Sequence, residues 1–320
     1  MDYKDENINP YVSVVVPAHN EAAGIERTIN ELQRVLKESQ VEYELIVVDD
    51  GSQDETYAQI QQLARQDKTL KGVCFSRNFG KEAALLAGLE VASGDVIITI
   101  DADLQHPPEL IPKLIEQWRQ GFKVVHAIKQ DRTRDGIFAR WRAYVFNSLL
   151  TRLGGVDVRN SSDYKLLDRA AVDVIVKNLP ERRRFYRGLA DWIGFEQATV
   201  PFVVAERNAG KGKWSILSLA DLAITAIVSF TSAPLRIVTF LGLLTLVFGM
   251  LVAGETLLSW IQGRAVSGFA TIIITLLIIG SFIMISLGII GEYIAKMYDE
   301  IKRRPAYLVS ARCGFDGVDT

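Results

Sequence analysis

The chain of 320 residues is poor in cysteine and nearly neutral overall. Its two cysteines, Cys74 and Cys313, form neither a metal-binding spacing nor a disulfide framework, which is consistent with a reducing, cytoplasmic location. A formal net charge of −2 gives no overall basic field, so nucleic acid is not expected as a partner. Residues 1–9 lack the basic start and apolar stretch of a secretory signal, and we expect the segment that follows to stay in the cytoplasm.

Charge is nearly absent from one long part of the chain. Charged residues are dense up to Lys213 and then scarce as far as residue 294. We therefore predict a soluble domain over residues 1–212 and a membrane-embedded remainder. The remainder divides into an amphipathic helix at the membrane interface over residues 213–233, a transmembrane hairpin over residues 234–296 and a C-terminal tail over residues 297–320.

The predicted hairpin consists of two apolar stretches, residues 237–261 and 269–294. At about 1.5 Å per residue, each is long enough to cross a hydrocarbon core of about 30 Å. The connection holds one cation, Arg264, whereas several cations flank the outer ends: Arg236, Lys296, Lys302, Arg303 and Arg304. Because cationic flanks stay on the cytoplasmic side, we expect both termini and the soluble domain in the cytoplasm.

The soluble part alternates short β-branched runs with amphipathic helical stretches, a pattern typical of an α/β domain. Strands are predicted at residues 12–16, 43–48, 72–75, 96–100 and 123–127, and helices at residues 22–38 and 54–66, the second capped by Asp54. This pattern favours a mostly parallel sheet with helices on both faces. Ligands of such sheets bind outside the carboxyl ends of the strands, so the residues that follow each strand are the site candidates.

The clearest candidate follows the fourth predicted strand. Asp101 and Asp103 are two residues apart, so their side chains can point to one side and share a divalent cation, with Gln105 as a third oxygen donor. Hard oxygen ligands select Mg²⁺ or Mn²⁺, and such an ion neutralises a diphosphate leaving group. The alternative is a turn or helix cap, where aspartate is common. A second acidic strand end, at Asp49 and Asp50, favours the metal site.

The adjacent carboxylates Asp49 and Asp50 precede Gly51, which permits a tight turn and close approach of a ligand. A carboxylate here can accept hydrogen bonds from a ribose hydroxyl or a base N–H group. A plain turn explains Gly51 but not two adjacent carboxylates. Residues 17–21 follow the first strand and would flank the same nucleotide. We assign no proton transfer to His19, for which a surface position is the alternative.

Four strand-end sequences together resemble the inverting family 2 glycosyltransferases of GT-A fold: Pro17-Ala-His-Asn-Glu21, Asp49-Asp-Gly-Ser52, Asn78-Phe-Gly-Lys81 and Asp101-Ala-Asp-Leu-Gln105. More narrowly, the chain resembles the polyisoprenyl-phosphate glycosyltransferases, the group of dolichyl-phosphate mannose synthases and bacterial bactoprenol glucosyltransferases of the Gtr type. The resemblance runs from about Tyr11 to the end of the second predicted span.

The resemblance implies roles for the strand-end residues. The nucleotide would be held by Pro17, His19, Glu21, Asp49, Asp50, Asn78, Lys81 and Asp101, and the metal by Asp101, Asp103 and Gln105. Asp157, with Asp163 as second choice, falls where the family places a carboxylate near the reacting carbon, as a base or as an orienting group. Asp103 joins them as a catalytic residue through the metal.

The resemblance also implies a site for the phosphate of a lipid acceptor. Its residues would come from a basic loop with the following helix and from a second basic loop beside the membrane: Arg132, Arg134, Arg140, Arg142 and Asn147, then Arg207, Lys211 and Lys213. Guanidinium groups match phosphate geometry. The alternatives are a solvated basic helix face for the first set and headgroup anchors for the second.

The implied reaction is a metal-assisted, single-step inverting transfer of glucose from UDP-glucose to undecaprenyl phosphate at the bacterial inner membrane. GDP-mannose or another UDP-sugar as donor is the alternative. Small residues on the predicted spans allow close helix packing, from which we expect a homo-oligomer: Gly242, Gly249, Gly280 and Gly288.

Three other classes fit the sequence less well. A processive polysaccharide synthase would carry more spans and a Gln-x-x-Arg-Trp element, which this sequence lacks. A Rossmann dehydrogenase or P-loop enzyme would carry a glycine fingerprint after the first strand, where this chain has Pro17. A non-enzymatic membrane scaffold would have no need of intact acidic strand ends.

Overall fold

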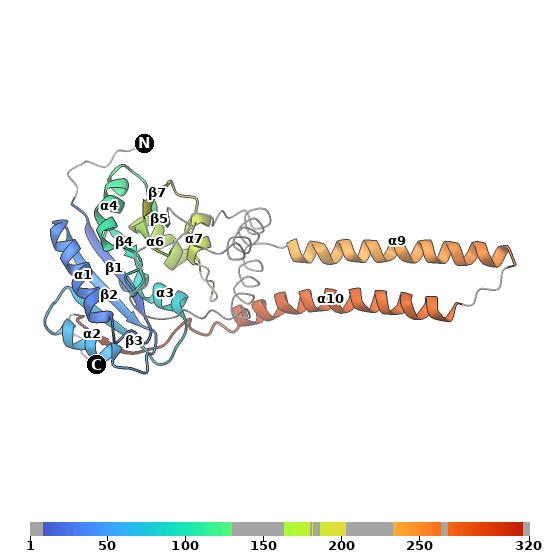
Figure 1. Ribbon diagram of the computed structural model, residues 1–320, viewed down its shortest axis with the longest axis horizontal. Coiled ribbons are helices and arrows are strands. Elements are labelled where there is room, and N and C mark those ends of the chain that lie inside the picture. Colours follow the sequence, from blue (N-terminus) through green and yellow to red (C-terminus); the bar gives the residue numbers. More distant parts are fainter. Residues whose placement is uncertain are drawn as a thin grey trace. The chain divides into compact units, whose positions relative to one another are not determined.

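The computed structural model describes residues 9–129, 163–179, 181, 186–202, 233–263 and 268–315. The chain divides into two compact units. The first comprises Met1–Arg152, Val156–Leu219 and Pro305–Thr320, and the second comprises Leu153–Gly155 and Ala220–Arg304. In Figure 1 the first unit is a sheet covered by helices, and the second contains two long helices.

Within the described residues, the first unit is built on an eight-stranded sheet of order β7-β5-β6-β4-β1-β2-β3-β8. The strands are β1 (Tyr11–Ala18), β2 (Glu42–Asp49), β3 (Leu70–Phe75), β4 (Val96–Thr99), β5 (Val124–Lys129), β6 (Lys165–Asp168), β7 (Gln197–Phe202) and β8 (Val309–Cys313). β1 pairs in parallel with β2 and β4, β2 with β3, and β5 with β7. Antiparallel pairs join β4 to β6, β5 to β6 and β3 to β8. The sheet is therefore mixed, with a parallel centre.

The α/β fold class predicted from the sequence is confirmed. All five predicted strands are present as β1 to β5, and the two predicted helices are α1 (Ile25–Glu38) and α2 (Thr56–Ala64). The N-cap residue of α2 is Glu55 and not the predicted Asp54, which lies one residue earlier and accepts a hydrogen bond from the backbone N–H of Thr56 at 3.1 Å. The sequence did not predict β6, β7 and β8, of which β6 and β8 make the antiparallel pairs.

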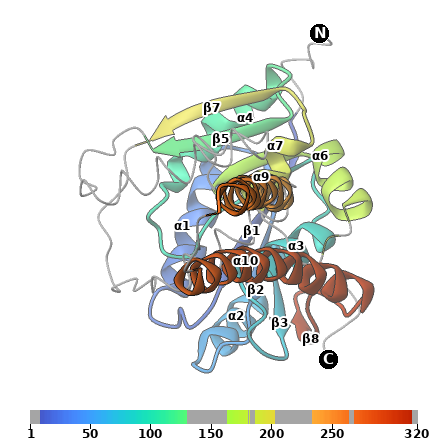
Figure 2. The same cartoon turned by 90° about the vertical axis from the view of Figure 1, so that its right-hand side faces the viewer.

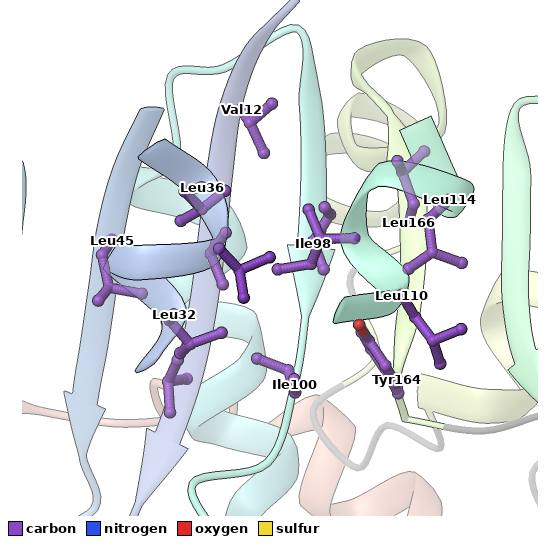
Figure 3. Close-up of a cluster of buried hydrophobic side chains, with 14 of the residues drawn as sticks. Val12, Leu32, Leu36, Leu45, Ile98, Ile100, Leu110, Leu114, Tyr164 and Leu166 are labelled. Atoms are coloured by element: carbon purple, nitrogen blue, oxygen red, sulfur yellow. The ribbon is translucent and has the colours of Figure 1, made fainter. Parts of the chain in front are cut away.

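Helices cover both faces of the sheet. On one face, α1 buries Ile25, Ile29, Leu32 and Leu36 at helical spacing. With the short η1 (Pro108–Leu110) and α4 (Ile111–Arg119), it forms one apolar cluster with the sheet (Figure 3). The cluster includes alternate residues of β1: Val12, Val14 and Val16.

The opposite face carries α3 (Lys81–Val91), whose Gly88 lies against Val15 of β1. Val15 points to this face because successive side chains of a strand alternate. Three short helical elements complete the described part of the unit: α6 (Arg169–Asp173), the π-helical η3 (Val174–Asn178) and α7 (Tyr186–Trp192). Parallel strands β1, β2 and β4 thus carry helices on both sides and present their carboxyl ends at one edge.

The second unit contains α9 (Ala233–Ile261) and α10 (Phe269–Ile301), which contain the predicted spans. The stretches Pro234–Ile261 and Ile272–Ile301 each contain an 18-residue window of high mean hydropathy, 2.4 and 2.7 respectively, and both are long and apolar enough to cross a membrane. The interfacial helix predicted over residues 213–233 lies, apart from Ala233, outside the described residues.

Replacement of Gly88 by alanine tests the packing of α3 on the sheet. An added Cβ would lie 2.1 Å from Cγ1 of Val15, so helix and strand would have to separate. We expect Gly88→Ala to lower the free energy of unfolding by about 1–3 kcal/mol, the usual effect of overpacking a core. The measurement is thermal unfolding of the full-length protein in detergent. In a Val15→Ala background the same replacement should have a smaller effect, and an equal effect in both backgrounds would contradict the contact.

Candidate functional site

The loops that follow the parallel strands meet in one pocket of about 400 Å³. Its lining comes from the loops after β1, β2, β3 and β4: Pro17, Ala18, His19, Glu21, Asp50, Asn78, Gly80, Lys81, Asp101, Ala102 and Asp103. Most of the residues that the sequence assigned to nucleotide and metal are therefore together. Two assigned residues, Asp49 and Gln105, are not among those that line the pocket within the described part of the chain.

Asp50 joins the loop after β2 to the loop after β3. Its buried carboxylate accepts hydrogen bonds from the backbone N–H groups of Phe79 at 2.7 Å and Gly80 at 2.9 Å. Burial raises the pKa of Asp50, and these two hydrogen bonds offset only part of that rise. Gly51, with φ of 64°, lies so close to Arg77 that a Cβ would come within 2.3 Å of its backbone carbonyl carbon. The two loops are thus fixed against each other.

Asp49 has a different role from its neighbour. Its buried carboxylate accepts a hydrogen bond from the hydroxyl of Ser52 and lies 3.2 Å from the Sγ atom of Cys74. The plain-turn alternative therefore describes Asp49, while Asp50 lines the pocket.

His19 contacts the same turn through its ring. Its Nδ1 atom lies 2.9 Å from the carbonyl oxygen of Asp50, and its Nε2 atom lies 3.1 Å from the side-chain nitrogen of Asn20. Asn20 adopts a φ of 55° and accepts a hydrogen bond from the backbone N–H of Gln53. The loops after β1 and β2 are therefore also bonded to each other.

Asp101 and Asp103 bring two carboxylates to the pocket from the end of β4. The Oδ1 atom of Asp101 lies 2.5 Å from Nζ of Lys81. The Oδ1 atom of Asp103 accepts a hydrogen bond from the backbone N–H of Gln105 at 3.0 Å, across Leu104 with φ of 54°. Among the described residues, no group of three or more histidine, cysteine, aspartate or glutamate side chains could hold a metal ion. Asp101 and Asp103 are the two carboxylates that the end of β4 offers to a cation in the pocket.

Asp163, the second choice for the catalytic carboxylate, makes ion pairs with two cations and is not among the residues that line the pocket within the described part of the chain. Two nitrogens of Arg187 donate hydrogen bonds to the Asp163 carboxylate, at 2.7 and 2.8 Å, and Nζ of Lys81 lies 2.7 Å from its Oδ2 atom. Burial alone would raise the pKa of Asp163, but the hydrogen bonds from Arg187 and the charge of Lys81 outweigh it and hold the pKa far below its usual range. The carboxylate is therefore ionised at every physiological pH and does not take up a proton here.

Lys81 stands between the two carboxylates of Asp101 and Asp163 and lines the pocket. Burial would lower its pKa, but these two negative charges outweigh burial and raise it. Lys81 thus carries a full positive charge into the pocket. Arg187 was not identified from the sequence, because it comes from α7 and reaches the site only through the tertiary fold.

Three further ionisable residues near these ion pairs were also not identified from the sequence. Burial lowers the pKa of His106, whose Nδ1 atom lies 3.9 Å from Asp101. Burial lowers the pKa of Lys165 to about 8, and its Nζ atom lies 4.7 Å from the ring centre of Tyr186. Burial raises the pKa of Glu82 to about 7, and the nearby charge of Asp163 adds to the rise. None of the three belongs to a strand-end motif.

Several assigned residues lie outside the described part of the chain. They are the first-choice catalytic carboxylate and the whole lipid-phosphate set: Asp157, Arg132, Arg134, Arg140, Arg142, Asn147, Arg207, Lys211 and Lys213. Their assignments stay predictions.

Replacement of Glu82 by glutamine tests the electrostatics beside the pocket. Glu82 accepts a hydrogen bond from the N–H of Tyr186 at 2.8 Å, and its pKa rises from 4.5 to about 7 on folding. The folded state therefore holds this proton more tightly, so its contribution to stability is complete below pH 4.5 and is lost as the pH rises through 7.

We expect Glu82→Gln to melt roughly 2–5 °C above the wild type at pH 8, with the difference shrinking toward pH 5. The measurement is thermal unfolding at both pH values. A difference of the same size at both would show that Glu82 does not titrate as described.

Comparisons of the sequence with known proteins identify its family. The profile of glycosyl transferase family 2 matches residues 13–187. An uncharacterized glycosyltransferase of Synechocystis sp. is 38% identical over 307 residues, which are 95% of this chain and 96% of that protein. The SfII prophage-derived bactoprenol glucosyl transferase of Shigella flexneri is 38% identical over 306 residues, 93% of this chain and 97% of that protein.

A solved structure that matches is glucosyl-3-phosphoglycerate synthase from Mycobacterium tuberculosis in complex with Mn²⁺, UDP and glucosyl-3-phosphoglycerate. The match has a TM-score of 0.45 and 24% sequence identity, and it covers 68% of this chain and 76% of that chain. The family profile covers more than half of the sequence, and the two relatives cover nearly all of it. The chain is a glycosyltransferase and belongs to glycosyl transferase family 2.

Proposed function

We propose that this glycosyltransferase moves glucose from UDP-glucose to a polyisoprenyl phosphate, with undecaprenyl phosphate as the acceptor. The observation that carries the proposal is the meeting of Asp50, Lys81, Asp101 and Asp103 in one pocket at the carboxyl ends of parallel strands. The similarity to a bactoprenol glucosyl transferase over nearly the whole length, including the region of α9 and α10, supports this acceptor.

The pocket suits a nucleoside diphosphate in size and charge. A volume of about 400 Å³ lies within the range of small-molecule sites. The loops after β1 and β2 would hold the nucleoside, with Asp50 as an acceptor for its N–H or hydroxyl groups. Lys81 would bind the diphosphate, because its charge is directed into the pocket and cannot be lost near neutral pH.

The residues present fit a divalent cation, either Mg²⁺ or Mn²⁺. Asp101 and Asp103 both line the pocket, so hard oxygen donors from two carboxylates are available there. The buried Nδ1 atom of His106 has no hydrogen-bond partner within the described residues, which leaves one more polar atom for a ligand to satisfy. Mg²⁺ is commonly held by one or two carboxylates together with phosphates and water. When bound to Asp101 and Asp103, with Gln105 as a further donor, the ion would neutralise the diphosphate leaving group.

The chemical step we propose is a single in-line displacement. A phosphate oxygen of the acceptor attacks the anomeric carbon, the bond from that carbon to the diphosphate breaks, and UDP leaves with inversion at the carbon. A phosphate monoester with a second pKa near 6 is largely dianionic at neutral pH, so the acceptor needs little help from a base. Asp163 would act as a positioning residue for Lys81, and Asp157 would orient the sugar or the acceptor.

The acceptor phosphate would be bound by the arginines of residues 132–142, by Asn147 and by the basic residues of 207–213. With α9 and α10 in the bilayer, the catalytic unit would face the cytoplasm at the bacterial inner membrane, where the lipid phosphate is available. The small residues on these helices support assembly as a homo-oligomer.

The test of the proposed function is a panel of nucleotide sugars incubated with the full-length protein, undecaprenyl phosphate and Mg²⁺ or Mn²⁺. We expect lipid-linked glucose from UDP-glucose, and no product after chelation of the metal. A lipid-linked product from GDP-mannose alone would overturn the assignment of UDP-glucose as donor. The absence of a lipid-linked product with every donor would overturn the proposed reaction.

Replacement of Asp103 by alanine tests the metal assignment. Loss of one of two carboxylate ligands should reduce turnover by at least ~100-fold, because charge on the leaving diphosphate would no longer be neutralised. The variant should remain folded and membrane-bound. Glu109→Ala is the matched control, since Glu109 is an exposed carboxylate that contacts Arg34 at 3.3 Å. Full activity of Asp103→Ala would remove Asp103 from the metal site.

A further inference from the structure

The segment that follows α10 in sequence is built into the sheet of the first unit. β8 lies beside β3 (Figure 2), and the two strands pair antiparallel from Gly72 opposite Cys313 to Phe75 opposite Val309, with a register shift between Cys74 and Phe75. The backbone N–H of Ser76 adds a hydrogen bond to the carbonyl of Leu308 at 2.9 Å. Cys313 is buried at the end of β8. The segment therefore covers what would otherwise be the exposed edge of β3.

Tyr307, just before β8, contacts two elements that lead to the pocket. Its ring stacks on Phe75, with ring centres 4.7 Å apart and planes inclined by 15°. Its hydroxyl donates a hydrogen bond to the carboxylate of Glu90, on α3. Phe75 is the last residue of β3, and α3 begins with Lys81. The ring of Tyr307 therefore contacts the residue directly before the loop of residues 76–80, whereas Glu90 lies near the far end of α3.

Phe75 in turn contacts a residue of the loop, Phe79. Its ring meets the ring of Phe79 edge-on, with centres 5.8 Å apart and planes inclined by 88°. The guanidinium group of Arg77 lies 4.2 Å from the centre of the same Phe79 ring. The ring of Phe79 therefore contacts one aromatic ring and one cation.

The loop in turn shapes the pocket. The N–H groups of Phe79 and Gly80 hold the carboxylate of Asp50, and Asn78, Gly80 and Lys81 line the pocket. A continuous series of contacts therefore leads from Tyr307 through Phe75 and Phe79 to Asp50. Tyr307 itself is not among the residues that line the pocket in the described part of the chain.

We infer that Tyr307 is a positioning residue of the donor site: it holds the loop of residues 76–80 in the shape that binds the nucleotide. The C-terminal segment then supports the nucleotide site from outside the pocket. This inference rests on the proposed function, because it takes the pocket to be where the nucleotide binds. Without the stacked ring, the loop would sample other conformations, and binding would have to order it again.

The test measures binding of UDP with Mn²⁺ to the full-length protein in detergent by calorimetry. Tyr307→Ala should raise the Kd by about five- to tenfold, the loss expected when an aromatic pair is removed. Tyr307→Phe keeps the ring and should stay within about twofold of the wild type. Ser310→Ala is the matched control on the same segment, because the Ser310 hydroxyl bonds to the carbonyl of Cys74 instead.

A second measurement needs no nucleotide. Hydrogen exchange at the N–H groups of Phe79 and Gly80 should be faster in Tyr307→Ala than in the wild type, and unchanged in Tyr307→Phe and Ser310→Ala. If Tyr307→Ala does not fold, Tyr307→Leu, which keeps apolar bulk but no ring, should give the same local increase.

The outcomes separate the two proposals. Unchanged UDP affinity together with unchanged exchange in Tyr307→Ala would overturn the positioning role. Faster exchange spread evenly over β1 and β2 would also overturn it, because it would indicate a general loss of stability. A wild-type protein that binds no nucleotide would instead contradict the proposed function.

Discussion

The pocket depends on one buried carboxylate with two cations around it. Asp163 comes from the residues before β6, Lys81 from the start of α3 and Arg187 from α7, and all three meet at hydrogen-bonding distance. A buried charge without a partner is costly, so each element has to take its place for the network to be stable. Lys81 then reaches Asp101 at the end of β4. The positions of the side chains at the carboxyl ends of the strands therefore depend on these ion pairs as well as on the sheet.

Around this network, backbone groups complete the site. Asp50 is held by two N–H groups of the loop after β3, and the loops after β1 and β2 are bonded through His19 and Asn20. The outer edge of the sheet is completed by β8, which comes from beyond α10 in sequence. Residues beyond α10 in sequence thus pair with β3, which leads into a pocket whose lining comes entirely, within the described residues, from the first third of the sequence.

The sequence predicts the central strands and the meeting of their loops because both follow from local patterns. β-branched runs mark β1 to β5, and parallel strands bring their ends together whatever the details of packing. It does not predict β6, β7 and β8, because their pairing depends on segments far away in sequence, nor Arg187, because α7 approaches through tertiary packing. The sequence could in principle have predicted that only one of Asp49 and Asp50 lines the pocket. Neighbouring residues at a strand end point to opposite sides, so only one of them could face the pocket.

The central claim is that the strand-end carboxylates bind a cation and a diphosphate as one unit, and metal-dependent nucleotide binding tests it most directly. The affinity for UDP would be measured with Mn²⁺ and with a chelator, for the wild type and for Asp101→Asn. Coupled binding predicts that Mn²⁺ strengthens UDP binding to the wild type by about tenfold or more and leaves Asp101→Asn nearly unaffected. An equal gain from Mn²⁺ in both proteins would contradict the claim.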